Sequence, residues 1–227
     1  MGHKVPPYAL RIGINRNWRS KWFFSKYYPL FLQADYLIRK EIEKMFPRHG
    51  IIDVIIERKS LDQCKVEIYA AKPGVIVGKD GQNLKNLYKK LEKILKPLFE
   101  NKKISYPSLD INVIEVKRPY LYAQYLAEQI ALQIEKGTKT RVAMKNILNQ
   151  VKEIKEIQGI KIKVSGRIDG QDISREETLT YGKLPLSKLI ADIDYGFKVI
   201  MTKYGTNGVK VWLYKGDKKG YLENAPA

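Results

Sequence analysis

Between residues 30 and 116 the apolar positions follow first a helical spacing and then a strand spacing. Apolar side chains three or four residues apart from Phe31 to Met45 predict a helix, which Pro47 and Gly50 end. Alternating positions predict two strands, and a glycine-rich loop, a long amphipathic helix and a third strand follow. These segments are residues 52–57, 64–70, 72–81, 84–98 and 109–116. Their order predicts one compact α/β unit.

A second pattern starts after Lys117, Arg118 and Pro119. The residue before a proline disfavours helix and proline itself can open one, so we expect a domain boundary here. Two amphipathic helices are predicted next, ending near Gly137 and Gly159. The strand segments that follow are residues 160–165, 174–181, 192–201 and 209–214. The predicted class is α+β, with a second α/β domain of two helices packed on an antiparallel sheet.

These patterns divide the chain into an N-terminal arm (residues 1–29), a first domain (30–117), a second domain (118–219) and a short tail (220–227). The arm mixes proline, arginine and aromatic residues without a clear period. Interleaved aromatic and basic side chains suit RNA contact. An arm packed on its own protein is an equally good interpretation, so both stay open.

A large excess of basic residues indicates a polyanionic partner. The 227 residues include 42 Lys and Arg against 24 Asp and Glu, a net charge of +18. Nucleic acid is the leading partner and a membrane surface the second. No apolar run approaches the roughly 18 residues of a membrane-spanning helix, and the first residues lack the apolar core of a signal peptide. We therefore expect a soluble, unexported protein without membrane contact.

Cysteine and histidine are too few for much of the usual site chemistry. Cys64 is the only cysteine and His3 and His49 are the only histidines, which excludes an intrachain disulfide and a zinc site of typical spacing. Cys64 continues an alternating apolar run and is predicted to be a core residue. Asp192 and Asp194 could hold a metal, but a structural ion pair or a turn is favoured. We predict no catalytic residue, metal or cofactor.

The glycine-rich segment before the long helix is the strongest candidate site. It superficially resembles a nucleotide-binding P-loop, but its spacing is one residue short and Asp80 replaces the required hydroxyl. Gly78 to Gly81 instead matches the GxxG loop of KH domains, whose glycines let backbone amides approach phosphates. Its place after two strands and before a helix fits the prokaryotic-type KH domain. The expected RNA contacts are Lys72, Gly74, Gly78, Lys79 and Gly81.

Further basic residues extend the predicted RNA contacts. Arg141, Lys145 and Lys152 share one side of a predicted helix, beside its apolar face, where they could follow one strand. From the spacing alone, a solvated basic face is at least as good an interpretation. Only ten of the 42 basic residues are arginines, so phosphate positioning should dominate over base recognition. The other candidates are Lys4, Arg11, Lys161, Lys163, Arg167 and Lys210.

Six short segments together resemble the bacterial-type small ribosomal subunit protein three family, over essentially the whole chain. They are Met1 to Val5, Lys72 to Lys79, Val164 to Arg167, Leu184 to Leu186, Ala191 to Gly196 and Gly208 to Trp212. The resemblance implies a two-domain protein in the head of the small subunit that binds ribosomal RNA beside proteins ten and fourteen. It also implies that the protein lines the channel where messenger RNA enters and helps to unwind structured messenger.

The chain departs from this family's pattern at three places. The family carries two adjacent arginines and a nearby lysine at the messenger channel, and the matching positions here are Arg141, Val142 and Lys145. Asp80 stands where a basic residue is usual, and we interpret it as the N-cap of the long helix. The tail after Lys219 is short and scarcely basic.

Two other functions remain open at this point. A free KH-type RNA chaperone or assembly factor would share the charge and the loop, and it would not sediment with ribosomes. A nucleic-acid lyase or nuclease is the enzyme alternative, although no general-base constellation supports it. We predict a structural, non-enzymatic protein of the cytoplasmic ribosome, with an organellar ribosome as the other possible location.

Overall fold

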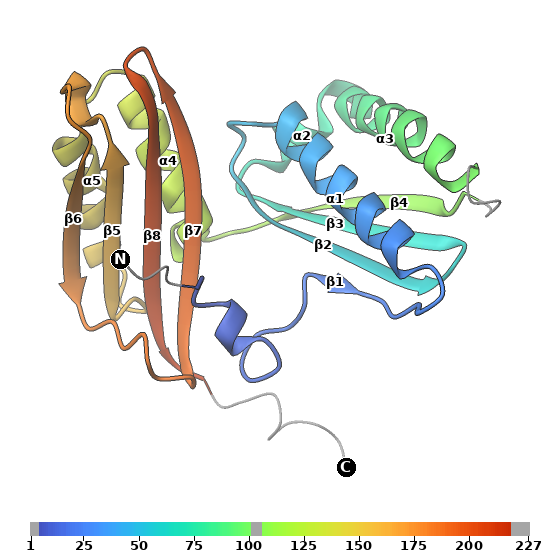
Figure 1. Ribbon diagram of the computed structural model, residues 1–227, viewed down its shortest axis with the longest axis horizontal. Helices are drawn as coiled ribbons and strands as arrows, with labels where there is room; N and C mark the ends of the chain where they lie inside the picture. Colours follow the sequence, from blue (N-terminus) through green and yellow to red (C-terminus); the bar gives the residue numbers. More distant parts are fainter. Residues whose placement is uncertain (1–4, 101–105, 219–227) are drawn as a thin grey trace. The chain divides into compact units, whose positions relative to one another are not determined.

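The computed structural model describes residues 5–100 and 106–218 (Figure 1). They form two compact units, Arg19–Pro119 on the one hand and residues 5–18 with residues 120–218 on the other. The predicted arm is thus divided, because its first part packs on the C-terminal unit. Within the described ranges no helix is long and apolar enough to cross a membrane.

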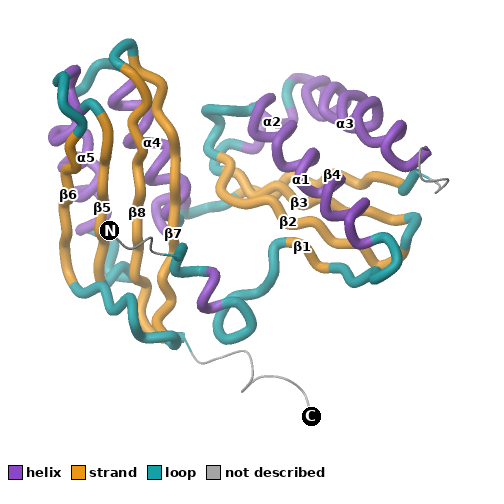
Figure 2. The backbone as a smooth tube through the Cα atoms, viewed as in Figure 1, coloured by secondary structure: helices purple, strands orange, loops and turns teal. Residues whose placement is uncertain are grey.

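The first unit is a four-stranded sheet with helices on one face (Figure 2). Its elements are β1 (Ser20–Lys21), α1 (Tyr28–Met45), β2 (Ile51–Ser60), β3 (Gln63–Ala70), α2 (Pro73–Val77), η2 (Lys79–Gly81), α3 (Gln82–Glu100) and β4 (Ser108–Glu115). The strand order is β1-β2-β3-β4. β2 and β3 are antiparallel, whereas β4 runs parallel to β3 and β1 runs parallel to β2.

Strand alternation and helix periodicity both turn apolar side chains into the core of this unit. Ile56, Val66 and Ile68 from the strands meet Phe31 and Leu91 from the helices. Cys64 is buried in the same cluster, as predicted, and burial raises the pKa of its thiol to about 11. It is therefore an inert core residue at neutral pH.

One buried ion pair joins the helix and sheet layers of the first unit. Arg58 of β2 donates to the Asp35 carboxylate of α1 at 2.7 Å, and the Trp22 indole donates to the other oxygen at 2.8 Å. Both charged side chains are almost wholly inaccessible. Removing either partner would leave an uncompensated buried charge.

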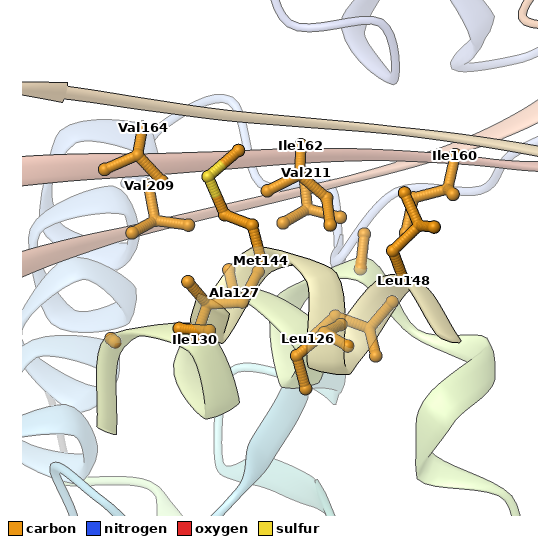
Figure 3. Packing of buried hydrophobic residues seen from close by; sticks show 14 of the residues in the cluster. Leu126, Ala127, Ile130, Met144, Leu148, Ile160, Ile162, Val164, Val209 and Val211 are labelled. Atoms are coloured by element: carbon orange, nitrogen blue, oxygen red, sulfur yellow. The ribbon is translucent and has the colours of Figure 1, made fainter. Parts of the chain in front are cut away.

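The second unit is an antiparallel sheet with both of its α-helices on one face. Its elements are η1 (Ala9–Arg11), η3 (Pro119–Leu121), α4 (Ala123–Glu135), α5 (Thr140–Lys152), β5 (Gly159–Gly166), η4 (Ile168–Gly170), β6 (Arg175–Gly182), β7 (Ala191–Thr202) and β8 (Gly205–Asp217). The strand order is β6-β5-β8-β7. Figure 3 shows α4 and α5 side chains such as Leu126 and Met144 packed against Ile162 and Val211 of the sheet. The predicted α+β class is confirmed.

Two arginines, Arg11 and Arg16, hold residues 5–18 on the second unit. Arg11 is fully buried, and its guanidinium donates to the carbonyls of Pro7, Leu186, Lys188 and Ala191 at 2.8–3.0 Å. The prediction that Arg11 contacts RNA is therefore wrong, since all of its charge lies inside the protein. The interpretation of an arm packed on its own protein holds for this segment.

Asp192 and Asp194 form ion pairs with Arg16, which is the structural role that the sequence favoured. Arg16 bridges them at 3.2 and 3.0 Å, and Lys218 reaches Asp192 at 3.1 Å. Burial alone would raise the pKa of Asp192, but Arg16 and Lys218 hold it below its usual value. Asp194 also accepts the Ala123 backbone N–H at 2.8 Å and so caps α4.

Candidate RNA interface

The glycine-rich segment consists of a short helix and a tight turn rather than one long loop. Proline at its start and the buried Ile76 favour helix α2, which occupies most of the segment predicted as loop. The GxxG turn follows, and Gly78, Asp80 and Gly81 have φ values of 76°, 51° and 70°. These left-handed conformations are the reason for the glycines, because most side chains strain there.

The two glycines of the turn differ in what surrounds them. A Cβ atom at Gly78 would lie 2.7 Å from the Asn83 side chain, which donates to the Val75 carbonyl at 2.9 Å. A Cβ atom at Gly81 would meet nothing within 4 Å. Gly78 is thus required by packing, whereas Gly81 faces open space where a phosphate could approach.

Asp80 does not cap the long helix. Helix α3 begins at Gln82, and the left-handed backbone of Asp80 is not the extended conformation of an N-cap residue. Its side chain is exposed beside Lys79, whose ammonium is also exposed. The turn therefore presents one positive and one negative side chain, and these two charges offset each other.

Helix α3 supplies lysines that the sequence analysis did not single out. Lys85, Lys89 and Lys93 are exposed and lie four residues apart, so they form a stripe that leads away from the GxxG turn. Their regular spacing was visible in the sequence. Lys72 is exposed just before α2, and Gly74 lies within α2 with open space around it.

Helix α5 carries the second group of candidates. Arg141 and Lys145 are exposed and one turn apart, while Met144 and Ile147 are buried. Val142 is exposed beside them. The exposed Lys136 and Lys139 in the preceding turn add basic charge that the sequence analysis missed.

The third group lies on the sheet of the second unit. Lys161, Lys163 and Lys210 project from the face opposite the helices. Lys163 pairs with Glu176 at 2.6 Å. Arg167 is largely occupied, because it donates to Gln171 and Asp172 of its own turn and to the Tyr204 carbonyl between β7 and β8. Lys4 lies outside the described residues.

The part of the chain that the structure describes contains no group of three His, Cys, Asp or Glu side chains suited to a metal ion.

The first unit has a GxxG turn between the β2–β3 pair and the long helix α3, and its last strand, β4, runs parallel to β3. These features define it as a KH-type RNA-binding domain. A KH domain family model matches residues 35–121, and a model for the C-terminal domain of ribosomal protein S3 matches residues 130–213.

Whole-chain comparisons identify the family. The chain is 44% identical over 218 residues to "Small ribosomal subunit protein uS3" of Carboxydothermus hydrogenoformans, covering 96% of this chain and 93% of that protein. It is 42% identical to the proteins of the same name from Persephonella marina and Coprothermobacter proteolyticus, covering 96% and 100% of this chain and 92% and 93% of theirs. The chain belongs to the uS3 family of small-subunit ribosomal proteins, and it is a structural protein rather than an enzyme.

Proposed function

We propose that this protein is a structural constituent of the small ribosomal subunit that binds ribosomal RNA in the head. The single observation that carries the proposal is similarity to uS3 proteins along nearly the whole chain, with the GxxG turn in place. We propose ribosomal RNA, messenger RNA and the neighbouring small-subunit proteins ten and fourteen as its partners. The ribosome of the cytoplasm is the proposed location. Cosedimentation with small subunits tests the proposal, and a protein that remains free would instead be a chaperone or assembly factor.

The KH turn is proposed to contact phosphate through its backbone. Gly81→Asp should weaken binding to RNA at least about fivefold, because it places a negative charge beside the approaching phosphate. Gly81→Asn is the matched control, since asparagine tolerates the left-handed backbone and adds no charge. Circular dichroism of both variants should match the wild type, because a side chain at 81 meets no neighbour. Equal affinities for the two variants would make the turn structural only.

Helix α5 is proposed to hold messenger RNA where it enters the subunit. Arg141 and Lys145 are exposed one turn apart, and Lys136 and Lys139 lie in the turn before the helix. Each phosphate contact would retain a strand just released from a hairpin and so oppose reclosure. Because Val142 is uncharged, this helix has one positive charge fewer at the proposed contact than the family pattern.

The double variant Arg141→Ala, Lys145→Ala should slow translation of hairpin-containing messages about twofold or more relative to unstructured ones. Both side chains are exposed, so stability should change by about 0.5 kcal/mol or less. Ribosome transit on matched messages that differ in one hairpin measures the effect. Val142→Arg should be neutral or faster.

Lys152→Ala is the matched control for this helix. It also removes a positive charge from α5, but about 16 Å along the helix from Arg141, where the ammonium lies 4.9 Å from the Tyr181 ring centroid. It should leave transit unchanged. Equal slowing of both messages in the double variant would remove the unwinding role and leave a solvated face or a ribosomal RNA contact.

A further inference from the structure

The face of the second unit's sheet that α4 and α5 leave open carries ordered rows of side chains. Buried residues such as Ile162 and Val211 point toward the helices (Figure 3), so their neighbours along each strand point to the open face. Strand register aligns these neighbours across β5, β8 and β7. Two successive rows are Lys161, Trp212, Tyr195 and Lys163, Lys210, Phe197.

The first row is partly covered and the second is open. The ring centroid of Tyr8, in the N-terminal segment, lies 6.3 Å from that of Tyr195. The centroid of the Tyr195 ring lies 5.5 Å from that of Trp212. Beyond this cluster, Phe197 is 42% exposed, and Val199 and Met201 on the same face of β7 are 45% and 74% exposed. An exposed aromatic side chain continuous with an apolar strip indicates a binding surface.

The backbone at Phe197 is already paired. The Phe197 N–H donates to the Gln124 side-chain oxygen at 3.1 Å, and the Gln124 side-chain nitrogen donates to the Phe197 carbonyl at 3.1 Å. β7 is an edge strand, and this clamp occupies the groups that an added strand would need. The clamp disfavours docking of a protein strand at this position and holds the ring in place.

The charge of the open face favours an anionic partner. The two rows contain Lys161, Lys163 and Lys210, and the adjacent Ser165–Glu176 pair contributes one acid, Glu176. Glu176 is highly exposed, so its ion pair with Lys163 contributes little and can yield to a phosphate. The Lys210 ammonium lies 6.0 Å from the centroid of the Phe197 ring, which places positive charge directly beside the aromatic face.

We propose that this open face binds unpaired RNA, with a base stacked on Phe197 and flanking phosphates on Lys163 and Lys210. Stacking accepts any base, and lysine recognises phosphate without sequence preference. The flexible Lys210 side chain can move from the ring to a phosphate as a base takes its place. The inference rests on the proposed RNA-binding function and adds its ligand class, single-stranded RNA, and an aromatic contact.

The test measures binding of a labelled, unstructured RNA of about ten nucleotides to the full-length protein by fluorescence anisotropy. Phe197→Leu keeps an apolar side chain of similar size but removes the ring, and it should weaken binding about tenfold. Phe197→Trp should bind as tightly as wild type or more tightly. Tyr36→Leu is the matched control, because it also removes an exposed ring (Tyr36 is 62% exposed on α1 of the first unit), and it should have no effect.

A parallel comparison with Gly81→Asp separates this inference from the KH proposal. If Phe197→Leu weakens binding and Gly81→Asp does not, the result supports RNA binding by the sheet and contradicts the proposed KH contact. If Gly81→Asp abolishes all binding of single-stranded RNA, the sheet does not bind and the inference is overturned. It is also overturned if Phe197→Leu binds RNA as wild type does while Phe197→Asp lowers incorporation into small subunits, because the strip would then be a protein docking surface.

Discussion

Replacing Arg11 with methionine should destabilise the C-terminal unit by about 3–5 kcal/mol, a large fraction of the stability of a domain of this size. Methionine keeps the apolar stem of the side chain but removes every donor. Four backbone carbonyls, three of them in residues 186–191, would then lose the guanidinium donor, although those of Lys188 and Ala191 keep a second, longer hydrogen bond. The N-terminal segment would lose its main anchor on the unit.

Hydrogen exchange followed by mass spectrometry can assign this loss to one unit. We expect faster exchange in β7 and β8 of the Arg11→Met variant and unchanged exchange in β2 and β3, because the first unit has its own core. Arg19→Met is the control. Its ion pair with Asp53 is solvent-exposed, so its removal should cost about 1 kcal/mol or less.

The same measurement can contradict the anchoring role. Unchanged protection of β7 and β8 in Arg11→Met would show that Arg16 and Asn15 hold the segment alone. Asn15 donates to the carbonyls of residues 189–191 at 3.2 Å, so this outcome has a structural basis. Equal loss in both units would indicate that they unfold together.

Periodicity in the sequence predicts most of this fold because each long element buries one face. The helix from Phe31 and the strands around Ile56 and Ile162 each keep one spacing over several residues, and the structure contains all of them. β1 was missed because its two residues form a strand only by pairing with β2. α2 was missed because glycines at both ends of a short apolar run predict a loop.

The candidate site was predictable where it depends on local chemistry and not where it depends on tertiary contact. The GxxG turn has positive φ values at Gly78, Asp80 and Gly81, and the glycine spacing reveals two of these three positions. The burial of Arg11 depends on carbonyls about 180 residues away, which no local pattern encodes. Phe197 likewise appears as one apolar position in a strand until the register sets it beside Lys163 and Lys210.

RNA affinity should fall roughly 300-fold between 50 and 200 mM monovalent salt if about six basic side chains contact phosphates of a single strand. The described residues offer that many exposed or half-exposed candidates on three surfaces: Lys72, Lys79, Arg141, Lys145, Lys163 and Lys210. Each contact releases condensed counterions, so the logarithm of affinity should decrease linearly with the logarithm of salt concentration. Unrelated sequences should bind with similar affinity because lysine predominates.

Filter binding across a salt series measures this slope for the wild type and two variants. Lys163→Gln with Lys210→Gln should make it shallower by about 1.4, as two lost phosphate contacts require. Lys188→Gln is the matched control, because its ammonium is paired with Asp217 and should add no phosphate contact. A flat wild-type plot, or strong discrimination among unrelated RNAs, would contradict phosphate binding by lysine as the main source of affinity. A change of slope of about 0.7 in Lys188→Gln, half that of the double variant for one lost charge instead of two, would mean that total charge, rather than the sheet face, determines binding.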